Sequence, residues 1–97
     1  MKNSLIGKRC VVRINKAGVF FGTVERITKQ SITLSSYVRL WSWTGALCVE
    51  QIARCGVKSA KAAHGTLQVL DREDGGQVVV ATDIAANVLS TLPETVV

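Results

Sequence analysis

Four runs in the first half of the chain have the hydrophobic and polar pattern of β-strands. Residues 8–14 and 19–27 are rich in β-branched and apolar residues, and in residues 31–35 and 37–44 the two faces of a strand alternate with period 2. Short stretches of turn residues separate the first three runs, including Gly18 after the first. The spacing predicts an antiparallel meander of four strands with tight connections. Gly22, inside the second run, predicts a bulge or a close approach by another backbone.

Past residue 44 the apolar positions take up the spacing of a helix. The positions with this spacing are Leu47, Cys48, Ile52 and Cys55. Thr44 can serve as the N-cap and Gly56 as the glycine that ends the helix, so we expect a helix between them with both cysteines on its buried side. Residues 58–65 are polar and rich in Ala, and we expect a loop there.

Two further strands and a second helix complete the predicted elements. Residues 66–71 and 77–81 read as strands, and the residues between them have strong turn chemistry, so we expect a β-hairpin. Thr82 or Asp83 caps a helix over residues 84–92, which Pro93 stops. The apolar stripe of this helix consists of Ile84, Ala85, Val88, Leu89 and Leu92.

The resulting order is four strands, a helix, two strands and a helix, which indicates an α+β fold rather than alternating βαβ units. We expect the four-stranded antiparallel meander to form an SH3-like or small curved sheet, followed by the helix, the hairpin and the C-terminal helix. The sequence contains no internal repeat, linker or low-complexity segment. Residues 1–97 are therefore expected to form a single domain.

Charge is distributed unevenly along the chain. Residues 1–61 contain eleven Lys and Arg against two Glu, whereas residues 62–97 contain one Arg against five acidic residues. A basic first half attracts a phosphorylated ligand or a polyanion. The acidic second half argues against nucleic acid wrapping over the whole surface, and the asymmetry could equally draw neighbouring subunits together.

The sequence gives little sign of catalysis, metal binding or membrane insertion. Its single histidine, His64, has no evident partner, and the three cysteines, Cys10, Cys48 and Cys55, lack metal-site spacing. No glycine-rich phosphate-binding motif is present. We therefore expect a non-enzymatic protein without metal or cofactor. No apolar run is long enough to span a membrane, and no apolar signal segment opens the chain, so we expect a cytoplasmic location.

The most informative segment is the run from Tyr37 to Thr44, which holds every Tyr and Trp of the chain. Strand alternation predicts one face with three rings around a guanidinium and another face for the core. The first face consists of Tyr37, Arg39, Trp41 and Trp43, and the second of Val38, Leu40 and Ser42. Rings offer stacking surfaces to a base, and a planar cation suits a phosphate. The same residues are also enriched in cores and subunit interfaces, and both interpretations remain open.

Four segments of the chain form a recognisable pattern: Val12 and Arg13 in the first strand, the sequence AGVFFG at residues 17–22, RLWSWTGA at residues 39–46, and residues 52–58 after it. In order and spacing they closely resemble a widespread family of small phage and prophage proteins of unassigned function. The resemblance covers most of residues 5–92. It departs at residues 59–65, where that family often has a cysteine and this chain has His64 and Gly65.

The pattern is more distantly similar to the type one anti-defence sponges that phages use against the Thoeris system. These sponges also have an Arg-ending first strand, an internal Gly in a strand, and an aromatic strand with a Thr-Gly step. They are oligomers that bind cyclic ADP-ribose isomers, and some also bind cyclic oligonucleotides. The resemblance implies a homo-oligomer, a dimer or hexamer, that sequesters such an immune signal in the cytoplasm of an infected bacterium.

This implied function assigns the candidate ligand-binding residues. Tyr37, Trp41 and Trp43 are the expected stacking rings, and Arg39 and Arg13 the expected phosphate ligands. Further expected contacts are Lys58 and His64 as mobile lid residues, Thr44, and Phe20. Since Phe20 and Phe21 alternate along one strand, only one of them should face a ligand while the other packs.

Two other functions fit the same residues. A basic sheet with surface aromatics suits single-stranded nucleic acid, and its signature is affinity that falls steeply with salt. The alternative is an oligomeric structural or interaction protein in which Trp41 and Trp43 anchor an interface and no small ligand exists.

Overall fold

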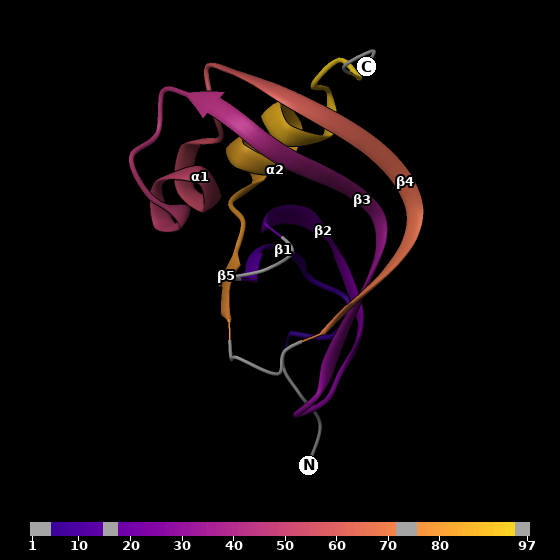
Figure 1. Ribbon diagram of the computed structural model, residues 1–97. Helices are drawn as coiled ribbons and strands as arrows, with labels where there is room; N and C mark the ends of the chain where they lie inside the picture. The colour runs from indigo at the N-terminus through magenta and orange to yellow at the C-terminus, as the bar shows by residue number, and fades with distance from the viewer. Residues whose placement is uncertain (1–4, 15–17, 72–75, 95–97) are drawn as a thin grey trace.

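The fold is a five-stranded antiparallel sheet with two helices packed at one end (Figure 1). The structure, a computed structural model, describes residues 5–14, 18–71 and 76–94. Its strands are β1 (Arg9–Ile14), β2 (Gly18–Ile27), β3 (Ser31–Thr44), β4 (Ser59–Asp71) and β5 (Gln77–Val80), and its helices are α1 (Val49–Cys55) and α2 (Asp83–Ser90). The spatial order of the strands is β4-β3-β2-β1-β5. This arrangement confirms the predicted α+β class and antiparallel sheet.

The strand count and pairing differ from the prediction in three places. The predicted third and fourth strands form one continuous strand, β3, and residues 59–65, predicted as a loop, belong to β4. The predicted hairpin of residues 66–71 with 77–81 is wrong, because β5 pairs with β1 at the other edge of the sheet. Two of the predicted turns, the one after the first strand and the one between residues 71 and 77, fall mostly on residues 15–17 and 72–75. These lie outside the described residues.

β3 is curved (Figure 1), and its backbone is irregular near the middle. Ser36 has a φ of 47°, and the register between β2 and β3 shifts between Phe21 and Thr23. Gly22 lies at this shift, where an added Cβ would be 3.1 Å from the Ser35 carbonyl oxygen and 3.2 Å from the Tyr37 Cα. The bulge and close backbone approach predicted at Gly22 are both present. In Figure 1, β3 and β4 curve together through the molecule.

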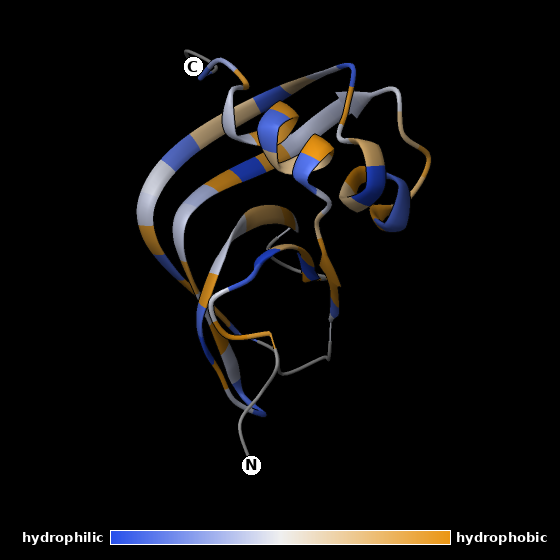
Figure 2. Ribbon diagram, turned by 180° about the vertical axis from the view of Figure 1, so that it is seen from behind, coloured by the Kyte–Doolittle hydropathy of each residue, from blue (hydrophilic) through white to orange (hydrophobic). Residues whose placement is uncertain are grey.

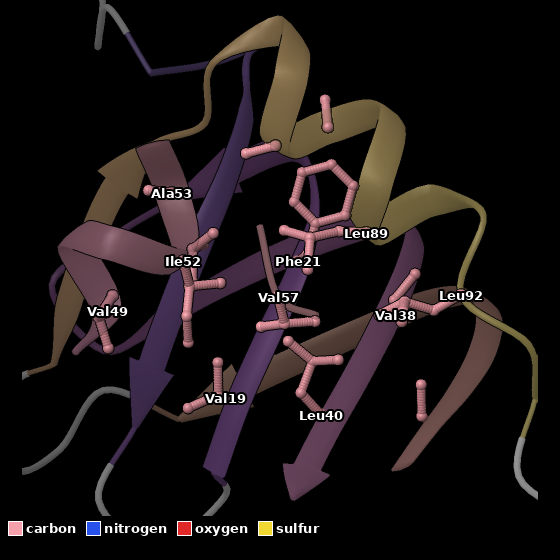
Figure 3. Packing of buried hydrophobic residues seen from close by; sticks show 14 residues of the cluster. Val19, Phe21, Val38, Leu40, Val49, Ile52, Ala53, Val57, Leu89 and Leu92 are labelled. Atoms are coloured by element: carbon pink, nitrogen blue, oxygen red, sulfur yellow. The ribbon is translucent and has the colours of Figure 1, made fainter. Parts of the chain in front are cut away.

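Apolar side chains fill both faces of the sheet. A helix-side cluster lies between the sheet and the helices and includes Val11, Phe21, Val38, Leu40, Ile52 and Leu89 (Figure 3). An opposite-face cluster includes Cys10, Val12, Phe20, Val24, Ile32 and Leu34. Hydrophilic and hydrophobic stretches alternate along β4 in Figure 2, since only some of its side chains reach either cluster. Burial raises the pKa of the Cys10 thiol, so this cysteine acts as a small core residue.

The first helix begins later than predicted, and this rotates its buried side. Cys48 rather than Thr44 is the N-cap residue, and the buried positions are Val49, Ile52 and Ala53. Cys48 and Cys55 are therefore exposed, which contradicts the prediction of buried thiols. The C-terminal glycine is confirmed, because Gly56 has a φ of 78° and its N–H donates to the Ile52 carbonyl at 2.8 Å.

The second helix begins at the predicted cap and docks on the helix-side cluster. The Thr82 hydroxyl accepts a hydrogen bond from the Ala85 N–H at 3.1 Å and donates one to the Arg54 carbonyl, which ties α2 to the end of α1. Ala85, Ala86 and Leu89 are buried, while Ile84 is exposed, so the docked stripe is shifted from the predicted one. Among the described residues, no helix has both the length and the apolarity to span a membrane.

Candidate ligand-binding site

A β-bulge at Trp41 separates the two tryptophans of β3. Leu40 pairs with Ala62 of β4 and Ser42 with Lys61, so Trp41 is an extra residue without its own partner. Beyond the bulge, Trp43 packs against the helix-side cluster that also contains Leu40. The prediction that Trp43 shares a face with Tyr37, Arg39 and Trp41 is therefore wrong, because one inserted residue reverses the alternation.

Tyr37, Arg39 and Trp41 do lie together, and they line a pocket of about 490 Å³ on the opposite face, named here the tyrosine pocket. Phe20 of β2 joins them because it pairs with Arg39 across the strands. The guanidinium carbon of Arg39 lies 5.8 Å from the centre of the Phe20 ring. The Phe20 and Tyr37 ring centres are 6.2 Å apart, with their planes tilted by 54°. The Arg39 guanidinium is thus placed for a cation–π interaction with the Phe20 ring at the base of the pocket.

Phe20 and Phe21 point to opposite faces, as strand alternation predicts. Phe21 belongs to the helix-side cluster, whereas Phe20 lines the tyrosine pocket. Phe20 is only 3% exposed, so it supports Arg39 and the pocket from below. Trp41, at 41% exposed, presents much more of its ring to solvent. Trp41 is therefore the ring most accessible to a ligand.

The tyrosine pocket is lined by charged side chains of both signs, Arg39 and Asp71. Arg39 lies with the aromatic residues, and its guanidinium is over the Phe20 ring. Gln68, Leu70 and Asp71 of β4 line the same pocket. A ligand with an anionic group beside Arg39 and hydrogen-bond donors beside Asp71 fits this distribution.

Two smaller pockets continue around the end of β3. The arginine pocket, about 300 Å³, shares Arg39 and Trp41 with the tyrosine pocket and adds Arg13 and Trp43. The glutamate pocket, about 340 Å³, shares Arg13 and Trp43 with the arginine pocket and adds residues of α1 and β5. The added residues include Leu47, Glu50 and Gln77.

Glu50 lines the glutamate pocket with a negatively charged carboxylate. Its carboxylate accepts a hydrogen bond from the Gln77 side chain. Hydrogen bonds from the Cys48 side chain, from the backbone and from Gln77 lower the pKa of Glu50, so the carboxylate is ionised at neutral pH. Arg13 and Glu50 thus give this pocket charges of both signs.

Three of the nine residues predicted from the sequence lie outside these pockets. The Thr44 hydroxyl is 2.8 Å from the Ser59 hydroxyl, and the Lys58 N–H donates to the Thr44 carbonyl. The His64 Nε2 atom is 2.6 Å from the Leu92 carbonyl oxygen, in strand β4 rather than in a loop. None of the three lines the tyrosine, arginine or glutamate pocket. In this structure they join strand ends and the C-terminal segment.

A family model matches residues 7–85, which is most of the chain. The chain belongs to the DUF6948 family, a domain of unknown function. No curated protein and no solved structure matches it. The matched range contains every residue named above as lining the three pockets, so the pockets belong to the family domain.

Metal binding has no support in the described part of the chain, where no three His, Cys, Asp or Glu side chains come together. Gln68, Asp71, Glu50 and Gln77 were not predicted as pocket residues, because only the strand pairing places them beside the aromatic segment. The close approach of Gly65 to Tyr37 was not predicted either. This glycine pairs with Tyr37 across β3 and β4, and an added Cβ would lie 2.3 Å from the tyrosine ring.

Replacing Gly65 with Ala should displace the Tyr37 ring and destabilise the fold by about 1–3 kcal/mol through overpacking. The measurement is a double-mutant cycle in urea, with Gly65→Ala made in the wild type and in Tyr37→Ala. In the Tyr37→Ala background the cost should fall to below about 1 kcal/mol, since the obstructing ring is gone. An equal cost in both backgrounds would mean that the ring does not rest on Gly65.

Proposed function

We propose that this protein is a non-enzymatic binding protein that sequesters a cyclic nucleotide immune signal, of the cyclic ADP-ribose or cyclic oligonucleotide type, and so blocks host anti-phage defence. The observation that carries the proposal is the position of Arg39, over the Phe20 ring and beside Tyr37 and Trp41 in one pocket. Stacked bases and charge-assisted phosphate bonds are the contacts that nucleotides need. Sequestration requires tight binding and no catalytic group.

The affinity that a sponge requires sets how many contacts must form. Nanomolar binding corresponds to about −12 kcal/mol. One stacked base contributes about 1–3 kcal/mol, and a hydrogen bond to a charged group about 1.5–3 kcal/mol. The tyrosine pocket alone offers one accessible indole and one guanidinium. We therefore propose that a homo-oligomer, a dimer or hexamer, closes the pocket in the cytoplasm of the infected bacterium.

Isothermal titration against a ligand panel tests the proposed function. The panel contains cyclic ADP-ribose isomers, cyclic di- and trinucleotides, and a single-stranded oligonucleotide at physiological salt. We expect saturable binding of one cyclic nucleotide with a dissociation constant near the nanomolar range, and at least about 100-fold weaker binding of the oligonucleotide. A panel without saturable binding would contradict the proposal.

An oligomeric interaction protein is the second candidate, because β4 is an edge strand with exposed apolar side chains. Leu67 and Val69 are 60% and 59% exposed on this strand. Exposed edges of this kind pair with other chains. A third possibility, a single-stranded nucleic-acid-binding module, would show affinity that falls steeply with salt concentration. The titration separates the three, since only the first requires a small ligand.

A further inference from the structure

We infer that the ligand is a dinucleotide, two nucleotide units joined through phosphate, seated around the end of β3 with one base on each side of the strand. This inference rests on the proposed function and makes it more specific. It depends on how the three pockets share residues: Arg39 and Trp41 line both the tyrosine and the arginine pocket, and Arg13 and Trp43 line both the arginine and the glutamate pocket. The arginine pocket is thus the middle of three neighbouring pockets.

The bulge at Trp41 gives the two ends of this series one tryptophan each. Without an inserted residue, two tryptophans at positions i and i+2 would share a face. The register shift between Leu40 and Ser42 leaves Trp41 at the tyrosine pocket and turns Trp43 toward the helix-side cluster and the glutamate pocket. Two bases of one ligand can therefore stack on different rings without competing for the same face.

The charges along the series match the order base, phosphate, base. The two arginines, Arg13 and Arg39, meet at the middle pocket, where the linking phosphate of a dinucleotide would lie. A carboxylate is present at each outer end, Asp71 in the tyrosine pocket and Glu50 in the glutamate pocket. Carboxylates repel phosphate and accept hydrogen bonds from amino and hydroxyl groups, so the outer pockets favour bases or sugars.

Neighbouring residues position the Glu50 carboxylate in the glutamate pocket. Gln77 donates to its carboxylate, and α1 and β5 place both residues beside Trp43. The Gln77 amide and the Glu50 carboxylate together offer a donor and an acceptor, which is what the edge of a nucleobase requires. At about 340 Å³ and 490 Å³, the two outer pockets are each within the usual range for small-molecule sites.

The test compares AMP with dinucleotides on the wild type and on Arg13→Met. We expect linear pApA or cyclic di-AMP to bind at least about 100-fold more tightly than AMP, since a second stacked base adds its own contacts. Arg13→Met should weaken dinucleotide binding about 10- to 100-fold, the size of one charge-assisted contact. Arg9→Met is the matched control, because Arg9 is an exposed arginine on the same strand that lines none of the three pockets.

Fluorescence gives a readout independent of affinity. The chain has two tryptophans, so Trp41→Phe leaves Trp43 as the single indole emitter. Dinucleotide should quench Trp43 emission in this variant, whereas AMP should not, because its base occupies the tyrosine pocket. Circular dichroism and the urea midpoint of each variant confirm that it is folded before binding is compared.

The possible outcomes separate this inference from the proposed function. If AMP binds and dinucleotides bind no more tightly, the two-base ligand is wrong and nucleotide binding stands. If dinucleotides bind tightly but Arg13→Met and Trp43 emission are both unaffected, the seating around β3 is wrong. Affinity that keeps rising with each added nucleotide of an oligomer would replace the dinucleotide with a nucleic-acid strand. If neither AMP nor any dinucleotide binds, the inference is wrong, and the cyclic ADP-ribose isomers and cyclic trinucleotides of the titration panel then decide the proposed function.

Discussion

Replacing Arg39 with Met should weaken nucleotide binding about 100-fold. A bidentate, charge-assisted contact with phosphate contributes up to about 3 kcal/mol, and a factor of ten corresponds to about 1.4 kcal/mol. Arg39 lines two of the three pockets, so its loss affects the ligand wherever the phosphate lies between them. Methionine keeps the apolar stem over Phe20 and removes the charge. Titration calorimetry with the tightest ligand of the panel measures the change.

The folded state of Arg39→Met should change little, since the side chain is exposed and its cation–π contact contributes about 0.5–1 kcal/mol. Arg26→Met is the matched control, an exposed arginine on β2 that lines none of the three pockets. Equal binding by wild type and Arg39→Met would remove Arg39 from the site. Equal losses in Arg39→Met and Arg26→Met would mean that general positive charge, rather than the pocket, drives binding.

Replacing Phe21 with Ala should lower the free energy of unfolding by about 3–5 kcal/mol, the usual cost of deleting a buried phenyl ring. Phe21 is 2% exposed and lies under α2 in the helix-side cluster (Figure 3). A small domain has a total stability of about 5–15 kcal/mol, so this loss is a large fraction of it. Urea denaturation followed by circular dichroism measures the change.

The matched comparison for Phe21→Ala is Trp41→Ala, which also deletes an aromatic ring but an exposed one. We expect Trp41→Ala to cost less than about 1 kcal/mol at every protein concentration. A cost comparable to that of Phe21→Ala, or one that changes with protein concentration, together with unchanged nucleotide binding, would show that Trp41 serves a subunit interface rather than a ligand. That result would favour the interaction protein over the nucleotide-binding protein.

Local sequence patterns predicted the fold wherever neighbours in the chain determine it. Strand patterns located β1, β2 and both halves of β3, while Gly22, Gly56 and Thr82 marked a bulge, a helix end and a helix start. The pairing partner of β5 could not be predicted, because the turn-forming residues between positions 71 and 77 favour a hairpin with β4. In the structure β5 pairs with β1, placing Val78 opposite Val12 and Val79 opposite Val11. Such long-range pairs leave no local signal.

The first part of β4, residues 59–65, was not predicted as a strand, for a related reason. Between Ser59 and Gly65 only Ala62 is buried, since β4 is the edge of the sheet and one of its long sides has no neighbouring strand. An edge strand with so few core contacts has the composition of a loop. His64 and Lys58 were expected to act as lid residues on that basis, whereas the structure gives His64 a hydrogen-bonded position beside Leu92.

The candidate site was partly accessible to the same reasoning. Period-2 alternation correctly placed Tyr37, Arg39 and Trp41 together, and the pairing of β2 with β3 added Phe20. Trp43 was misplaced because a single inserted residue at Trp41 reverses every following side chain, and nothing in the local sequence marks that insertion. The bulge is also the feature from which we infer a ligand with two bases.

The most direct test of the central claim is a titration of ¹⁵N-labelled protein with cyclic di-AMP, followed by NMR at the indole and backbone resonances. We predict saturable shifts of the Trp41 and Trp43 indole N–H signals together with the Arg39 and Tyr37 amides, with small changes elsewhere. Absence of saturable shifts for cyclic di-AMP and the other cyclic nucleotides, or shifts confined to Leu67 and Val69 on the edge of β4, would contradict nucleotide binding at the aromatic strand.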